Sequence, residues 1–238
     1  YILKNQVSSE HNHIYKGHSL TQKFLILLCS LTLLASTLSA APFAKVIFSD
    51  GEPHVIRKLK KIKLSKGDIV HYKDQIVTSS KDKVTLKSDD GHRIYVLEGT
   101  KFKVPTPKKK DVVINHEIGH IWFKMNPLKK EESFNVVTPS AVAGVRGTKF
   151  ITMVFGDKTT DLCVCEGEVL FRSGDTEKVV TTGQGSLSSL SKGMGSTFSN
   201  QSFIRQKRRL SRKPVCVNCH GDGYQDSSNL DGENLILK

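Results

Sequence analysis

Short runs of β-branched and aromatic residues recur along the chain between about residues 44 and 190, and turn-forming residues separate them. The runs occupy residues 44–48, 84–87, 93–97, 111–114, 134–137, 149–155 and 168–171. Pairs such as Asp50-Gly51 and Gly156-Asp157 stand between them, and these residue types support the backbone of tight turns. No stretch shows the 3.6-residue period of an amphipathic helix. The pattern predicts an all-β body of many short strands, arranged as a sandwich, a barrel or, as we favour, a solenoid-like stack.

Alternation within two neighbouring runs predicts which side chains face the core. Polar residues alternate with the apolar ones, which are Val84, Leu86, Ile94 and Val96. Successive residues of a strand point to opposite faces of the sheet. We therefore expect these four side chains on one buried face.

The first forty residues follow a different pattern. Lys23 precedes the apolar run 24–38, and the small residues 39–41 follow it. This order is typical of an export signal, and the run is shorter than the ~20 residues of a membrane-spanning helix. We expect cleavage after Ala40, which makes residues 1–40 a signal peptide with an upstream leader. An N-terminal anchor that is not cleaved is the alternative.

The chain is strongly basic. It has 36 Lys+Arg against 23 Asp+Glu, a formal net charge of +13, and a pI near 9.5. If the chain is exported, nucleic acid is not an expected partner, and an envelope protein or an anionic envelope surface is. Positive residues gather at 57–63, 108–110 and 205–213. We interpret the first two as solvated strand faces and a loop, and the third as a basic segment.

Composition excludes several classes of protein. With 18 Gly, 7 Pro and one long apolar run in 238 residues, the chain is not a collagen, a coiled coil or a polytopic membrane protein. The recurring apolar runs also exclude a wholly disordered chain. We divide it into the leader at 1–40, a β body at 41–190, a linker and basic segment at 191–215, and a tail at 216–238.

The order of motifs in the β body resembles that of a known family. Gly67-Asp68, Asp90-Gly91 and Gly99-Thr100 precede the string Val-Thr-Pro-Ser-Ala-Val-Ala-Gly-Val-Arg-Gly-Thr-Lys-Phe at 137–150. Over roughly 44–190 the sequence resembles the FecR-type domain of bacterial envelope proteins. The resemblance implies a β domain that binds a partner, often on the periplasmic side of an anti-sigma regulator. Because an export signal precedes the body, we do not carry over the sigma-factor role.

Part of this string is predicted to form a structural motif, made of Thr138, Pro139, Gly144, Arg146, Gly147 and Thr148. Pro139 cannot donate a ladder hydrogen bond, so a strand ends there. Gly144 and Gly147 permit bulge or turn geometry. Arg146 is expected to clamp carbonyls or a carboxylate, and ligand binding by Arg146 is the alternative.

Residues 116–120 read His-Glu-Ile-Gly-His, the H-E-x-x-H signature of zinc peptidases. That chemistry needs both histidines on one helix face, with Glu117 polarising the attacking water. The flanking residues are typical of a strand, on which His116 and His120 would share a face about 13 Å apart, too far for one metal. A zinc peptidase at His116, Glu117 and His120 is therefore the weakest functional alternative.

The tail contains a Cys-Val-Asn-Cys-His sequence, the attachment signature of a c-type haem. Cys216 and Cys219 would bind the porphyrin, and His220 would ligate the iron. Disulfides or unbridged thiols are a second interpretation, which export favours. A four-thiolate metal site with Cys163 and Cys165 is a third.

No nucleophile–base pair, paired carboxylates or glycine-rich phosphate loop stands out, so we do not expect an enzyme. The sequence favours a periplasmic or secreted, non-catalytic binding, scaffold or signalling protein of the bacterial envelope, without a cofactor. After signal cleavage it would not be an integral membrane protein. The alternative is a small periplasmic redox or electron-transfer protein with one covalent haem c at Cys216, Cys219 and His220.

Overall fold

The computed structural model describes residues 41–105 and 110–199. All of them belong to the compact unit that begins at Ala40. Their regular elements are all strands, and within these two ranges no helix is long and apolar enough to cross a membrane. The prediction of an all-β body is confirmed. The predicted signal peptide and the C-terminal cysteines lie outside the described residues.

The strands form two layers, called here sheet A and sheet B, which share the long strand β9 (Asp111–Lys124). Sheet A contains, in pairing order, β4 (Ile69–His71), β1 (Pro42–Asp50), β6 (Lys83–Lys87), β7 (Arg93–Val96), the second half of β9, β12 (Lys149–Val154), β13 (Thr160–Glu166) and β16 (Gln184–Ser189). β17 (Gly193–Met194) and β18 (Phe198–Ser199) both pair with β16.

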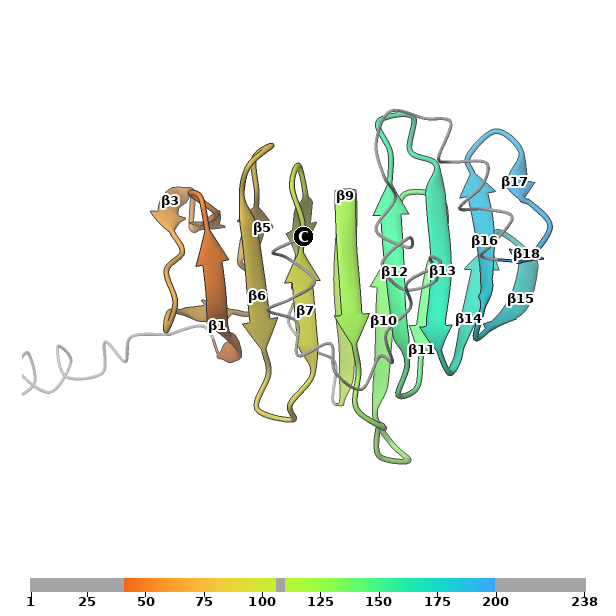
Figure 1. Cartoon of the computed structure of the whole chain (residues 1–238), viewed down its shortest axis with the longest axis horizontal. Coiled ribbons are helices and arrows are strands. Elements are labelled where there is room, and N and C mark those ends of the chain that lie inside the picture. Colours follow the sequence, from red (N-terminus) through yellow and green to blue (C-terminus); the bar gives the residue numbers. More distant parts are fainter. Residues whose placement is uncertain (1–40, 106–109, 200–238) are drawn as a thin grey trace, which may run out of the picture. The chain divides into compact units, whose positions relative to one another are not determined.

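Sheet B contains, in pairing order, β3 (Lys60–Lys63), β2 (His54–Arg57), β5 (Gln75–Val77), β8 (Lys101–Lys103), the first half of β9, β10 (Ser133–Val137), β11 (Val142–Val145), β14 (Glu168–Ser173) and β15 (Thr176–Thr181). The chain passes back and forth between the layers, and the strands of sheet A follow one another across the view in the order β1, β6, β7, β9, β12, β13 and β16 (Figure 1). This is the stacked arrangement that the sequence predicts.

The main hydrophobic core lies between the two sheets. The ring of Phe123 stacks on Phe150 with centroids 4.7 Å apart, and it meets Phe134 of sheet B edge-on at 5.8 Å. The prediction from alternation is confirmed, because the four side chains expected on one face are each at most 2% exposed in this core: Val84, Leu86, Ile94 and Val96.

Strand β9 passes from sheet B to sheet A through a β-bulge. Successive residues of β8 pair with Ile118 and His116, so Glu117 is an extra residue without a partner position. Gly119 follows with φ of +95°, and a Cβ there would lie 2.4 Å from the Cα of Thr100, so glycine is required. An extra residue inverts the alternation of faces beyond it, and this inversion changes the expected positions of the histidines.

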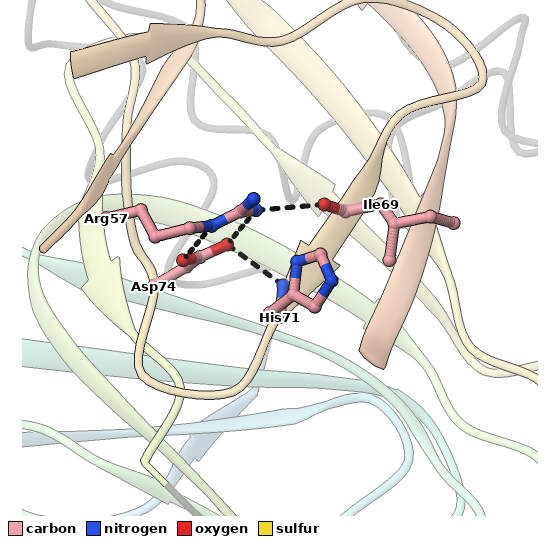
Figure 2. A network of polar contacts seen from close by, with 4 residues as sticks. All are labelled: Arg57, Ile69, His71 and Asp74. Atoms are coloured by element: carbon pink, nitrogen blue, oxygen red, sulfur yellow. Dashed lines mark hydrogen bonds and ion pairs between the residues drawn. The ribbon is translucent and has the colours of Figure 1, made fainter. Parts of the chain in front are cut away.

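The basic run 57–63 is solvated only in part. All four side chains of β3 are exposed, as predicted. Arg57, however, donates from Nε and Nη2 to the two carboxylate oxygens of Asp74 at 2.8 and 2.7 Å, and from Nη2 to the carbonyl of Ile69 at 3.1 Å (Figure 2). The same carboxylate accepts the backbone N–H of His71 at 2.9 Å. This network fastens β2 to the β4–β5 turn.

Candidate binding site

A pocket of about 250 Å³ lies where β1, β7, β9 and β10 meet the β4–β5 and β6–β7 turns. Its wall is apolar and consists mainly of Phe43, Tyr72, Ile94, Val112 and Phe134. The rings of Phe43 and Tyr72 meet edge-on with centroids 5.4 Å apart, a favoured aromatic geometry that fixes this side of the pocket. The wall can therefore hold an apolar group.

The rim of the pocket is acidic, although the chain as a whole carries +13. Asp89, Asp90 and Glu132 line it, and among the described residues of the rim the one lysine is Lys110. Burial lowers the pKa of His92, against the opposing effect of the nearby carboxylates, so His92 adds no positive charge at neutral pH. The pocket thus combines an apolar wall with a rim that attracts cations.

The acidic turn is held rigidly beside the pocket. Asn126 donates from Nδ2 to the carbonyl of Asp90 at 2.9 Å, and its backbone N–H donates to Nδ1 of His92 at 3.1 Å. Burial, and then the charge of Asp90, raises the pKa of Tyr72, which keeps the phenol a neutral donor. The site is therefore largely preformed.

The volume limits what the pocket can hold. Sites for small organic ligands usually enclose ~300–1,000 Å³, and this one is smaller at about 250 Å³. A single large apolar side chain with a cationic neighbour fits both the volume and the charge. Such an anchor residue is the usual centre of a protein–protein contact.

The H-E-x-x-H residues do not converge. His116 is 1% exposed in the interior, with Nδ1 2.9 Å from Oγ1 of Thr152. Glu117 lies at the surface in an ion pair with Lys101 at 2.8 Å. His120 lies on the face of sheet A that is turned away from the main core. Trp122, two residues further along β9, lies on the same face.

The prediction that His116 and His120 share a strand face is therefore wrong. The bulge at Glu117 inverts the alternation, so one ring points into the core and the other points away from it. The three side chains assemble no peptidase site in β9. Burial lowers the pKa of His116 to about 3, which marks a neutral core histidine.

The predicted structural motif is partly as expected. β10 ends at Val137, and Thr138 and Pro139 begin the following turn. Gly147 has φ of +68°, and a Cβ there would lie 2.8 Å from the Cα of Pro127, so glycine is needed. Gly144 is an ordinary strand residue whose Cβ would meet nothing closer than 3.4 Å.

The last two residues of the motif, Arg146 and Thr148, differ in burial and in their contacts. The prediction that Arg146 is a clamp is wrong, because its side chain is exposed and makes no hydrogen bond or ion pair with any residue that the structure describes. Thr148 is 1% exposed and supports the same turn, since its carbonyl accepts the backbone N–H of Met125 at 2.9 Å.

A buried hydroxyl network, which the sequence did not reveal, fastens the turn at residues 138–140 to sheet A. Ser140 donates to Oγ1 of Thr160 at 2.8 Å, and Thr160 donates to Oγ1 of Thr138 at 2.7 Å. Ser188 and Ser173 both donate to the carbonyl of Ser140 at 2.8 Å. Isolated serines have no distinctive spacing.

The predicted haem ligands Cys216, Cys219 and His220 lie outside the described residues and stay a prediction. Cys163 and Cys165 lie two residues apart on β13 and point away from the main core.

Residues 74–170 match the family model described as FecR protein, which confirms the sequence resemblance over this stretch. It contains the acidic turn and Glu132 of the pocket, whereas Phe43 and Tyr72 precede it.

Two solved structures are similar to the chain, both described as "a putative anti-sigma factor" from Parabacteroides distasonis ATCC 8503. The 2.50 Å structure shares 17% identity with a TM-score of 0.48 over 52% of this chain and 59% of that one. The 1.65 Å structure shares 16% identity with a TM-score of 0.49 over 58% of this chain and 65% of that one. The chain thus spans about three fifths of their length. None of the curated proteins compared with the chain matches it.

Proposed function

We propose that this chain is an exported, non-catalytic binding protein of the bacterial envelope that serves signalling or scaffolding. In this proposal the FecR domain captures a protein partner at the acidic-rimmed pocket. The observation that carries the proposal is the family match over residues 74–170, which includes the rigid acidic turn beside an apolar wall.

The charge of the pocket supports a protein partner over an anionic surface. Lipid headgroups and lipopolysaccharide would be repelled by Asp89, Asp90 and Glu132. An apolar side chain next to a lysine or arginine complements both the wall and the rim. The basic surface elsewhere on the chain remains available to steer it toward the envelope.

Cross-linking in cells tests the binding face. A photoreactive amino acid replaces Leu128, which lines the pocket, and in a matched chain it replaces Val179 of β15, which is 53% exposed. We expect an adduct of one defined mass from position 128 and none from position 179. Equal adducts from both positions, or an adduct from position 179 alone, would contradict the proposed face.

Export has its own test. The pattern of residues 1–40 supports cleavage after Ala40, so the mature protein recovered from the envelope fraction should begin at Ala41. Recovery of the chain with residues 1–40 intact in the cytoplasmic fraction would remove the export part of the proposal.

A covalent haem remains the second candidate function because of the Cys-Val-Asn-Cys-His sequence at 216–220. Visible absorption and a pyridine haemochrome assay, on chain exported from a host that matures c-type cytochromes, test it. A haem signal that disappears in Cys216→Ser would place the chain among redox or haem-sensing proteins. A colourless, intact protein would exclude the haem and leave binding as the one candidate function.

A further inference from the structure

The β2–β3 hairpin, residues 54–63, forms one edge of sheet B and turns through two residues, Lys58 and Leu59. Among the described strands β3 pairs with β2 alone, and it stands at one end of the row of strands (Figure 1). The residues that line the acidic-rimmed pocket include none from the hairpin. The hairpin is therefore a surface distinct from the proposed site for a protein partner.

Leu59 combines an unfavourable backbone conformation with almost complete exposure. The φ angle is +47° at Lys58 and +66° at Leu59, and a two-residue turn with both φ values positive is normally built from Asn and Gly. For a leucine this left-handed region is disfavoured. The side chain of Leu59 is nevertheless 97% exposed, so packing within the fold does not offset the cost. Strained residues of this kind gather at functional sites, and this one is placed for a contact outside the fold.

The charged side chains of the hairpin are all positive. It contains five lysines and arginines and no aspartate or glutamate. Lys63 pairs with Glu52 at 3.1 Å, whereas no carboxylate among the described residues pairs with Lys58, Lys60 or Lys61. Lysines on an edge strand also discourage pairing with another sheet, but that role does not require an exposed leucine at the tip. The cluster attracts an anionic partner.

The lysines lie on both sides of the hairpin. Ile62 is paired with Val55, which is buried in the main core, so Lys60 lies on the inner side with them. Lys61 and Lys63 lie on the outer side. An apolar tip with positive charge on both sides fits a flat anionic surface that meets the hairpin end-on. An acidic peptide that paired with β3 would instead contact the strand edge and leave the tip unused.

The base of the tip is fixed in place. Arg57, the residue before the turn, donates to both carboxylate oxygens of Asp74 and to the carbonyl of Ile69 (Figure 2). The charge of Arg57 is thus compensated inside the fold, and the lysines provide the charge for a partner. A preformed element loses little conformational freedom when it binds, so the hairpin is suited to docking as it stands.

We propose that the β2–β3 hairpin docks on the surface of an anionic lipid membrane. Leu59 enters the boundary between headgroups and acyl chains, as the apolar residues of interfacial segments do. Lys58, Lys60 and Lys61 lie against the lipid phosphates. This docking leaves the acidic-rimmed pocket open to a protein partner. The two surfaces share no residue, so either assignment can fail without the other.

Binding of the full chain to vesicles tests the docking. Leu59→Trp places a fluorophore at the tip, and Val179→Trp places one at a 53% exposed site on β15, the other edge strand of sheet B. Wild type, with Trp122 as its single tryptophan, gives the background. With vesicles of equal parts phosphatidylglycerol and phosphatidylcholine, emission from position 59 should shift to the blue and be quenched by brominated acyl chains. Position 179 should show neither change, and vesicles of phosphatidylcholine alone should leave both positions unchanged.

Substitutions at the tip separate docking from folding. Lys61→Gln should lower the partition coefficient onto the anionic vesicles about fivefold, the effect of one lysine near such a surface. Lys158→Gln, the same change at an exposed turn between β12 and β13, should not lower it. Leu59→Gly supplies the residue that a positive φ favours, so it should unfold at the wild-type temperature or above while its partition falls several-fold. A lower unfolding temperature in Leu59→Gly would give Leu59 a structural role and overturn the proposal.

Other basic parts of the chain provide the main competing explanation of any vesicle binding. The basic segment 205–213 is present in every variant, so each comparison reports the hairpin alone. Binding that Lys61→Gln and Leu59→Gly leave unchanged would assign the membrane contact elsewhere and overturn the proposal. An equal blue shift at position 59 with polyglutamate in place of vesicles would assign the hairpin to an acidic protein, which also overturns it.

Discussion

Arg57 holds the buried carboxylate of Asp74 through two parallel hydrogen bonds, of 2.8 and 2.7 Å (Figure 2). Asp74 is 1% exposed, whereas the side chain of Arg57 is 32% exposed. The pair also raises the pKa of Arg57, chiefly through the hydrogen bond to Asp74, so the guanidinium stays charged. It joins the end of β2 to the β4–β5 turn and thus fixes the Tyr72 side of the pocket.

Removing one partner of this pair should be costly. Arg57→Leu leaves a buried carboxylate uncompensated, and we expect the free energy of unfolding to fall by about 3–5 kcal/mol. Glu52→Gln, which breaks the exposed pair of Glu52 with Lys63 at 3.1 Å, should change it by less than about 1 kcal/mol. Urea denaturation of both variants measures the difference, and equal losses would show that the Arg57 pair has no special role.

Two glycines of the same motif should differ in their sensitivity to alanine substitution. Gly147→Ala forces a positive φ on alanine and a contact of 2.8 Å with Pro127, and should destabilise the protein by about 1–3 kcal/mol. Gly144→Ala has the space and an ordinary strand backbone, and should be neutral within about 1 kcal/mol. Thermal unfolding of both variants measures the difference. A larger loss of stability in Gly144→Ala than in Gly147→Ala would contradict this prediction.

The hydroxyl network should contribute measurably to stability. Thr160→Val keeps the shape of the side chain but leaves Ser140 and Thr138 without their shared partner, so we expect a loss of about 1–3 kcal/mol. Thr176→Val, at an exposed position of β15, serves as the control and should stay within about 0.5 kcal/mol. Indistinguishable unfolding curves would mean that the network is dispensable.

His116 should make stability depend on pH. Burial lowers the pKa of His116 from 6.5 to about 3. Between these two pH values the unfolded chain therefore binds a proton at His116 that the folded chain does not bind. Its contribution to stability is therefore complete above about pH 6.5 and is lost as pH falls toward 3, by up to about 1.4 kcal/mol per pH unit. The slope of unfolding free energy against pH between 6 and 4 should be shallower in His116→Gln than in wild type and in Thr176→Val.

The sequence was sufficient for the fold class because alternation and turn residues are local signals. Val84, Leu86, Ile94 and Val96 are buried together as their spacing predicts. The same alternation left Tyr95 on the opposite face, where only the strand register shows that it lies opposite Trp122. A local pattern cannot show which distant strands lie side by side.

The site was harder to predict for the same reason. Asp89-Asp90-Gly91 was recognisable as a turn, but Phe43, Tyr72 and Glu132 reach the pocket from distant parts of the sequence. The prediction for His120 was wrong because one extra residue, Glu117, inverts the alternation of side chains along β9. The expected clamp failed because the charge of Arg146 says nothing about whether its side chain points inward.

The most direct test of the proposed binding function is the yield of the position-128 cross-link in cells as the charge of the pocket rim is changed. Asp90→Lys places a cation at the exposed rim and should repel the partner, so the yield should fall at least about tenfold, equivalent to 1.4 kcal/mol. Glu168→Lys makes the same charge change at an exposed position of β14 and should leave the yield unchanged. An equal yield in Asp90→Lys and wild type would contradict the assignment of the acidic-rimmed pocket as the partner-binding site.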